Sequence, residues 1–160
     1  MKHQSKQDIA QHARIWEQGP ELRAQPEPVW AARRRRLQRL AEILDAHTGP
    51  LRLFLELECF PGHERRGMRQ DKSPLSVAYA DPVLRAEGLE GDTIGEAVDF
   101  FHMSMTEAHS LFCGCGYFGL DEQPGSLAKM AASRTRSMAA KRTFAERWDS
   151  ARGWFARLSA

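Results

Sequence analysis

Apolar residues recur at three- and four-residue intervals between residues 28 and 46, and this spacing predicts an amphipathic helix. Pro28 suits the start of such a helix, because the N–H that proline lacks has no partner in the first turn. The run Arg33–Arg36 would wrap around the helix, since consecutive residues lie about 100° apart. We therefore expect a solvated charge run there rather than a phosphate-binding strip. The predicted apolar stripe consists of Val29, Leu37, Leu40, Ile43 and Leu44, with Arg33 as its polar interruption.

A different pattern follows the break at residues 48–50. In residues 51–60, four leucines and Cys59 fall on one side of an alternating series, and Phe54 falls on the other side with arginine, glutamate and Phe60. A period of two predicts a strand that is half-buried on its leucine face. Leucine and glutamate favour helices, so a short helix is the alternative. Residues 75–80 could supply a second strand or begin a helix.

Residues 92–119 predict two helices joined by a tight turn. Thr93 and Glu96 have the spacing of a capping box at the start of the first helix. Ser104 and Glu107 have the same spacing at the start of the second helix. The pair has the pattern of a helix-turn-helix hairpin, and its expected apolar positions are Val98, Phe101, Met103, Ala108 and Leu111.

Weaker signals define the remaining elements. Residues 5–18 predict a short helix, and residues 61–73 predict a polar loop. Gly114 stands where the second hairpin helix would end in a left-handed residue. Residues 126–158 predict one long helix or two. Their loosely heptad-like stripe consists of Leu127, Met130, Met138, Phe144, Trp148, Phe155 and Leu158.

Together these elements predict a mainly α fold, a compact bundle of four to six helices. Residues 51–59 and 75–80 could add one small two-stranded β element. A chain of 160 residues has the size of one ordinary domain and can bury a core without metals or disulfides. We therefore expect a single helical domain over residues 1–160, with residues 1–27 loosely attached.

The net charge of +2 conceals two blocks of opposite sign. Residues 81–122 hold nine acidic residues against Arg85 alone, a net charge of −8. Residues 126–160 hold eight basic residues against two acidic ones, a net charge of +6. The simplest interpretation is that the two blocks pair with each other within the fold, and the alternative is that each binds a different partner.

The acidic block argues against DNA binding by the hairpin. Its second helix would expose Met105, Thr106, Glu107, His109 and Ser110, none of them basic, and phosphate contacts supply most of the affinity for DNA. The basic C-terminal region interleaves arginines with aromatic residues, as nucleic-acid-binding helices do. Core packing of the aromatic face explains the same pattern. The nucleic-acid candidates there are Arg142, Arg147, Arg152 and Arg157.

Cysteine and histidine residues are the second chemical signal. His109 and Cys113 stand four residues apart and would share a helix face, with Cys115 just beyond. Cys59 and His63 form a second pair of ligand types. These five residues could assemble a tetrahedral zinc site, although their spacing follows no established zinc motif. The simpler interpretation treats a buried cysteine as a small hydrophobic residue.

Nucleophilic catalysis is a further alternative, with Cys113 or Cys115 as the nucleophile and His63, His102 or His109 as the base. A reactive thiol normally lies near a helix N-terminus or a positive charge, whereas these thiols follow a helix within an acidic block. This placement argues against the catalytic interpretation. The chain also contains no glycine-rich phosphate loop, HExxH or GxSxG motif.

The sequence therefore predicts a non-enzymatic accessory or regulatory binding module, acting through protein contacts, self-association or nucleic acid. The alternative is a small zinc or thiol site protein. Three cysteines, an odd number, argue against a disulfide framework. With no apolar leader and no stretch of roughly 20 apolar residues, we expect a cytoplasmic location.

Overall fold

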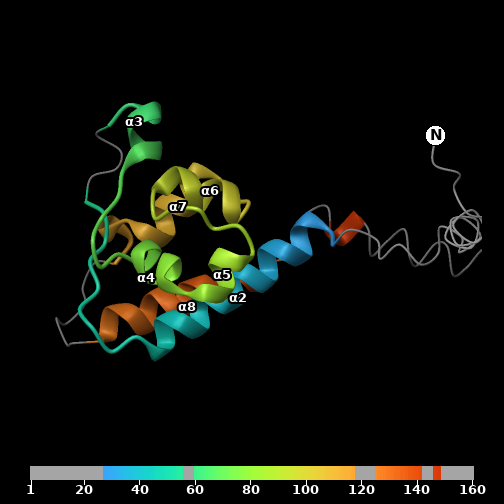
Figure 1. Ribbon diagram of the computed structural model, residues 1–160, viewed down its shortest axis with the longest axis horizontal. Coiled ribbons are helices and arrows are strands. Elements are labelled where there is room, and N and C mark those ends of the chain that lie inside the picture. The colour runs from blue at the N-terminus through green and yellow to red at the C-terminus, as the bar shows by residue number, and fades with distance from the viewer. Residues whose placement is uncertain (1–26, 56–59, 118–124, 142–145, 149–160) are drawn as a thin grey trace, which may run out of the picture.

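The computed structural model describes residues 27–55, 60–117, 125–141 and 146–148 (Figure 1). The predicted helix at residues 5–18 lies outside this part of the chain. The described residues are mainly helical, as predicted, and none of their helices is long and apolar enough to cross a membrane. The elements are α2 (Val29–Ala46), α3 (Gly62–Gly67), α4 (Pro74–Ala80), α5 (Pro82–Ala86), α6 (Ile94–Phe100), α7 (Met105–Phe112), the 3-10 helix η3 (Gly114–Gly116) and α8 (Ser126–Ala140).

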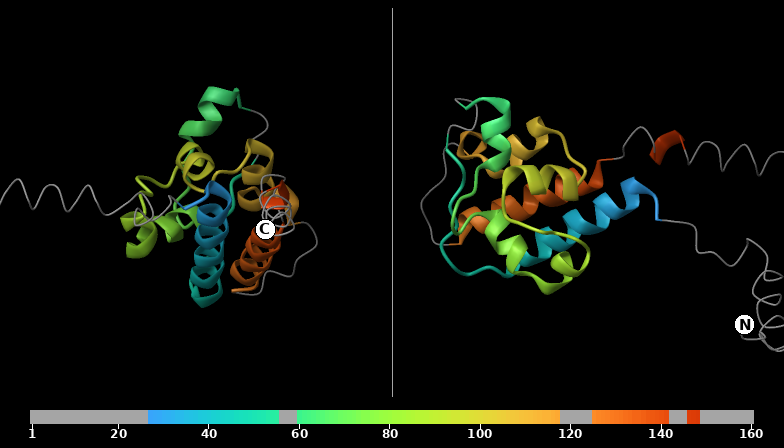
Figure 2. Two further views of the ribbon diagram at one scale, coloured as in Figure 1. Left: turned by 90° about the vertical axis from the view of Figure 1, so that its right-hand side faces the viewer. Right: turned by 45° about the horizontal axis from the view of Figure 1, so that its top comes forward.

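This part of the chain has seven α-helices rather than four to six, because five of them contain eight residues or fewer. The two long helices, α2 and α8, run side by side in opposite directions, and the short helices cover one side of this pair (Figures 1 and 2). α8 packs closely because its buried face is built mainly from small residues. Those residues are Ala128, Ala131, Ala132, Thr135 and Ala139, together with Met138.

Only part of the C-terminal prediction can be compared with the structure. α8 ends at Ala140, and residues 146–148 are again helical. Leu127 and Met130 are partly buried and Met138 is buried, as expected, whereas Trp148 is 56% exposed. Phe144, Phe155 and Leu158 lie outside the described residues.

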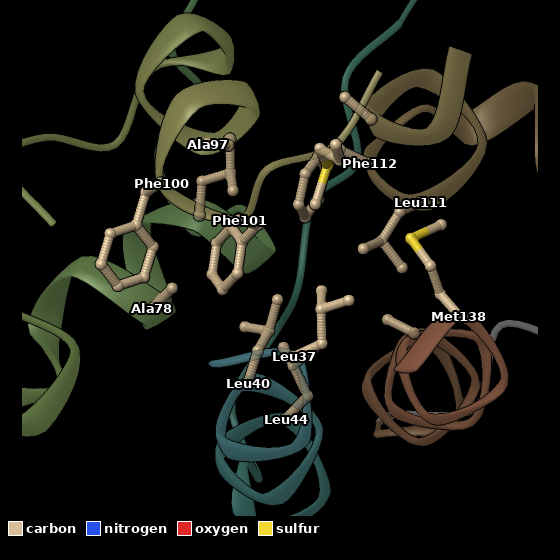
Figure 3. Packing of buried hydrophobic residues seen from close by; sticks show 14 of the residues in the cluster. Leu37, Leu40, Leu44, Ala78, Ala97, Phe100, Phe101, Leu111, Phe112 and Met138 are labelled. Carbon is tan, nitrogen blue, oxygen red and sulfur yellow. The ribbon is translucent and has the colours of Figure 1, made fainter. Parts of the chain in front are cut away.

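The hydrophobic core lies where α2 meets α6, α7 and α8. Leu37, Leu40 and Leu44 of α2 point toward Phe101 and toward side chains of α7 and α8 (Figure 3). The predicted apolar stripe of α2 is thus confirmed for its leucines, while Val29, the first residue of the helix, is 61% exposed. Burying a leucine or phenylalanine side chain contributes roughly 1.5–3 kcal/mol, so this cluster dominates the stability of the bundle.

The predicted helical hairpin is present as α6 and α7. The hydroxyl of Thr93 accepts the N–H of Glu96, and Ser104 and Glu107 form a full capping box. Its expected apolar positions are buried or partly buried. The predicted left-handed end at Gly114 is wrong. α7 ends at Phe112, and its C-cap Cys113 has an extended backbone with φ −95° and ψ 142°. Gly114, which follows, does not have a positive φ.

The predicted two-stranded element is also wrong. Residues 75–80 belong to α4, which begins where Ser73 caps the N–H of Ser76. Residues 51–55 make one isolated parallel bridge, between Phe54 and Cys113, and 56–59 lie outside the described part. The expected burial is reversed at Phe54, which is 1% exposed, and at Leu55, which is 76% exposed, whereas Leu51 and Leu53 are partly buried against the core as expected.

The predicted loop at 61–73 contains the six-residue helix α3. α3 packs against α6, and Met68 just after it accepts the N–H of Ile94 at 3.0 Å. The backbones of α3 and α6 approach each other closely at Gly95. A Cβ on Gly95 would lie 2.9 Å from the carbonyl oxygen of Arg66, so glycine is required there.

The acidic residues do pair within the fold, but mainly with α2 rather than with the basic C-terminal region. Arg33 is 7% exposed and donates to Glu107 of α7 at 2.7 Å. Arg36 donates to the carbonyl of Phe100 and lies 4.2 Å from the centre of its ring. The prediction of a solvated charge run at 33–36 is therefore wrong for Arg33 and Arg36, whereas Arg35 is exposed.

The other arginines of α2 complete this pattern. Arg34 holds both carboxylate oxygens of Glu146 at 2.7 Å, and Arg35 pairs with Glu27 and Glu87. One turn later, Arg39 pairs with Asp81, the residue that caps α5. Burial raises the pKa of Asp81, but hydrogen bonds from Arg39 and from two backbone N–H groups outweigh it and hold the pKa below its usual value.

Candidate metal centre

The end of α7 places three ligand-type side chains next to one another. His109 lies in the last turn of the helix, and the N–H of Cys113 donates to the carbonyl of His109 at 3.0 Å. Four-residue spacing puts both side chains on one face of the helix. The short helix η3 then folds back beyond Cys113 and brings Cys115 to the same face.

The ligand atoms of His109, Cys113 and Cys115 all lie within 4.8 Å of one another. The Sγ atom of Cys115 is 3.3 Å from Nε2 of His109 and 3.9 Å from Nδ1. A tetrahedral ion with bonds of about 2.0–2.3 Å keeps its ligand atoms about 3.5–3.8 Å apart. A closure of about 1 Å or less would therefore seat an ion, and the group could hold a metal.

The three residues differ in exposure. Cys113 is 1% exposed and belongs to the hydrophobic core, His109 is half-buried, and Cys115 is exposed. An ion held by all three would touch the core on one side and solvent on the other. No fourth histidine, cysteine or carboxylate joins the group among the described residues.

The segment at residues 51–55 fixes one side of the turn that carries Cys113 and Cys115, which we call the ligand turn. The N–H of Phe54 donates to the carbonyl of Phe112 at 2.9 Å, and the N–H of Gly114 donates to the carbonyl of Phe54 at 2.8 Å. Phe54 is anchored in the core, so Cys113 is held between two backbone hydrogen bonds. These two hydrogen bonds fix the backbone on both sides of Cys113.

α8 fixes the other side of the turn through Arg134. Its Nη1 donates to the carbonyl of Ser110 at 2.9 Å, and its guanidinium lies 4.1 Å from the centre of the Tyr117 ring. The hydroxyl of Tyr117 donates to the carbonyl of Leu111 at 2.8 Å, and its N–H donates to the carbonyl of Gly114. These contacts close the turn that carries Cys113 and Cys115.

The burial of Tyr117 has an electrostatic consequence. Loss of solvent raises the pKa of its hydroxyl to about 12, while the charge of Arg134 acts in the opposite direction. The hydroxyl is therefore protonated at neutral pH and remains a donor to Leu111. This hydrogen bond helps to hold the last turn of α7 next to the ligand residues.

The structure brings together three of the five predicted ligands. His63 lies on α3 and is not part of the group. Its side chain is 83% exposed, and its Nε2 lies 3.9 Å from Oε1 of Glu64. Cys59 lies outside the described residues. These three ligands could be predicted from the sequence without a known zinc motif, because His109 and Cys113 share a helix face and Cys115 follows two residues later.

His102, a candidate base in the catalytic interpretation, lies in the turn between α6 and α7. It is exposed and has a left-handed backbone with φ 48°. Partial burial and the charges of Arg36 and Arg33 lower its pKa, while Asp99 acts the other way. It is not a member of the ligand group.

Of the four nucleic-acid candidates, only Arg147 falls in the described part of the chain, where it is exposed. Arg142, Arg152 and Arg157 lie outside it. The binding of nucleic acid by this region stays a prediction. Compared with protein-family models, with curated proteins and with solved structures, the chain matches none.

Proposed function

We propose that this protein is a small metal-binding module that holds a zinc ion between His109, Cys113 and Cys115. The observation that carries the proposal is the convergence of one imidazole and two thiols within 4.8 Å. Two sulfurs and one nitrogen form a donor set that suits Zn²⁺ and other thiophilic ions rather than Mg²⁺ or Ca²⁺.

Charge and accessibility support the same assignment. Two thiolates balance the charge of a divalent ion, so a neutral complex can lie against the core at Cys113. The exposed side at Cys115 leaves a fourth position to water or to an external ligand. Closed structural zinc sites have four protein ligands, whereas a three-ligand site exchanges its ion or binds a further group.

As part of this proposal, we place the protein in the cytosol, where thiols stay reduced and available to an ion. The module has an accessory or regulatory role, and the ion joins Cys115 of η3 to His109 of α7. A partner that supplies the fourth ligand would bind on the exposed side of the site. This role involves no catalytic step by the protein itself.

Zinc titration of the reduced full-length protein against a chromophoric chelator tests the proposal. We expect one ion per chain, and an affinity at least about 100-fold weaker in Cys115→Ser and in His109→Ala. His63→Ala is the matched control, because its side chain is 83% exposed and lies outside the group. It should leave zinc affinity unchanged.

Elemental analysis of protein purified without chelator provides a second readout. Less than about 0.1 metal equivalents per folded chain, combined with no zinc uptake in the titration, would overturn the proposal. Equal affinity in Cys115→Ser and wild type would overturn the assignment of the ligands. Circular dichroism of each variant confirms that the protein tested is folded.

A further inference from the structure

We propose that Cys113 and Cys115 are also a thiol-exchange site, at which a low-molecular-weight disulfide converts the two thiols into a reversible intramolecular disulfide. The pairing itself rests only on the positions of the two cysteines. Its consequence, release of the ion, rests on the proposed function above. The two can therefore fail separately.

The geometry allows the bond. The two Sγ atoms lie within 4.8 Å of each other and belong to residues two positions apart. Residues with this separation have Cα atoms at most about 7 Å apart, close to the 4.4–6.8 Å span that disulfides adopt. Cys115 stands between the two glycines of the single 3-10 turn η3. Because glycine is conformationally permissive, this turn can rotate the sulfur of Cys115 toward Cys113.

The difference in exposure sets the order of the steps. Cys115 is exposed, and its sulfur lies 3.3 Å from Nε2 of His109. Cys113 is 1% exposed, so an external disulfide reaches Cys115 first. Among the described cysteines, Cys113 is then the one that lies beside the mixed disulfide.

Two exchange steps account for all atoms and electrons. The Cys115 sulfur attacks a disulfide RSSR, the S–S bond breaks, and RSH leaves with the proton given up by Cys115. The Cys113 sulfur then attacks Sγ of Cys115 and displaces the second RS group, which leaves as RSH with the proton of Cys113. The protein loses two electrons and two protons, and RSSR becomes two RSH.

The product would be easily reversed. A disulfide within three residues closes a very small ring, and strained or exposed disulfides are the ones that cellular thiols reduce. Its formation removes both thiolates from the donor set and leaves His109 alone, so zinc could no longer bind. Oxidised surroundings would thus release the ion, and reduced thiols would restore the site.

The test uses full-length, reduced, metal-free protein with oxidised glutathione as the probe. Cys59→Ser leaves only Cys113 and Cys115 as thiols. We expect this variant to lose both thiols and two hydrogen masses, with no glutathione retained. With Cys113→Ala added, a stable glutathione adduct should form on Cys115. With Cys115→Ser added instead, Cys113 should react at least about tenfold more slowly.

Several results would overturn the inference. They are two thiols retained by Cys59→Ser, a glutathione adduct that persists on Cys115 beside an intact Cys113, or equal reactivity of the two cysteines in the single-thiol variants. Cys113→Ala keeps an apolar side chain in the core, and we expect it to fold. Circular dichroism checks this before the rates are compared.

A second arm separates this inference from the zinc proposal. If one equivalent of Zn²⁺ slows oxidation and the oxidised protein binds no zinc, the linkage is supported. If the disulfide forms but zinc has no effect on its rate, the exchange site stands and the zinc assignment fails. If zinc binds and no disulfide forms, the zinc proposal stands and the exchange site is overturned.

Discussion

The guanidinium of Arg134 stacks over the ring of Tyr117 at 4.1 Å, while its Nη1 donates to the carbonyl of Ser110. Arg134 belongs to α8, whereas Ser110 and Tyr117 stand before and after the two cysteines of the ligand turn. One side chain from a distant helix therefore joins both ends of this turn. Contacts of this kind, one layer outside the ligands, fix ligand geometry in metal sites.

Arg134→Gln should weaken zinc binding about tenfold, because the turn loses the contact that holds its two ends together. The free energy of unfolding should fall by about 1 kcal/mol. Competition with a chelator and urea unfolding measure the two effects. Lys129→Gln, an exposed change on the same helix, is the control and should alter neither. Unchanged zinc affinity in a folded Arg134→Gln protein would contradict the positioning role.

Tyr117 should ionise well above the usual range. Burial raises its pKa from 10.0 to about 12, so the folded state holds the proton more tightly than the unfolded state. Its contribution to stability is therefore complete below pH 10 and is lost as the pH rises from 10 to about 12. Above that range it contributes nothing.

Ultraviolet absorbance of the Tyr79→Phe variant isolates this titration, since the chain has only two tyrosines. We expect the absorbance change of phenolate near pH 12, or together with unfolding if the protein unfolds first. Ionisation near pH 10 while circular dichroism still reports a folded protein would show that the hydroxyl is not buried.

Phe54 and Leu55 provide a direct test of the burial on this segment. Phe54→Ala should destabilise the protein by about 3–5 kcal/mol, because it leaves a cavity in the core. Leu55→Ala should change the free energy of unfolding by less than about 0.5 kcal/mol, because the side chain is 76% exposed. Denaturant unfolding of both variants decides the matter. If Leu55→Ala were the more destabilising of the two changes, the predicted burial of the leucine side of this segment would hold at Leu55 after all.

The pair between Arg33 and Glu107 should contribute more than an ordinary surface ion pair. Glu107→Gln keeps the shape of the capping side chain but leaves the charge of Arg33, 9% exposed at its side chain, without its carboxylate. Because Glu107 is 38% exposed, we expect a loss of about 1–2 kcal/mol rather than the full cost of a buried pair.

Two comparisons sharpen that measurement. Glu42→Gln removes the 67% exposed partner of Arg39 and should cost less than about 0.5 kcal/mol. Adding Arg33→Met to Glu107→Gln should recover most of the loss, since no unpaired charge then remains. A double variant no more stable than Glu107→Gln alone would show that the loss comes from the helix cap.

Elements with strong local signals were predicted from the sequence. The helix at α2 has a regular apolar period and a proline at its start. The hairpin of α6 and α7 has capping residues as well, which act within one turn of the chain. The segment at Phe54 was misjudged because it forms a single bridge. Without a sheet on either side, alternation no longer decides which side chain enters the core, and the larger phenylalanine does.

The same distinction applies to the candidate centre. His109 and Cys113 were placed on one face by helical spacing alone. The approach of Cys115 depends on a 3-10 turn held by Phe54 and Tyr117, contacts that no local pattern reveals. The burial of Arg33 was missed for a similar reason, because its partner Glu107 lies 74 residues away.

The four consecutive arginines of α2 make different attachments. Arg33 pairs with α7 and Arg34 with the helical residues at 146–148, Arg35 pairs with Glu27 and Glu87, and Arg36 also pairs with Glu87 and reaches the end of α6. Deleting a single residue just before this run would turn every following side chain by about 100°. All four attachments would be misdirected at once, although composition and net charge would hardly change. In this bundle the rotational setting of one helix specifies the arrangement of its neighbours, so an insertion or deletion in α2 should be far more damaging than a substitution.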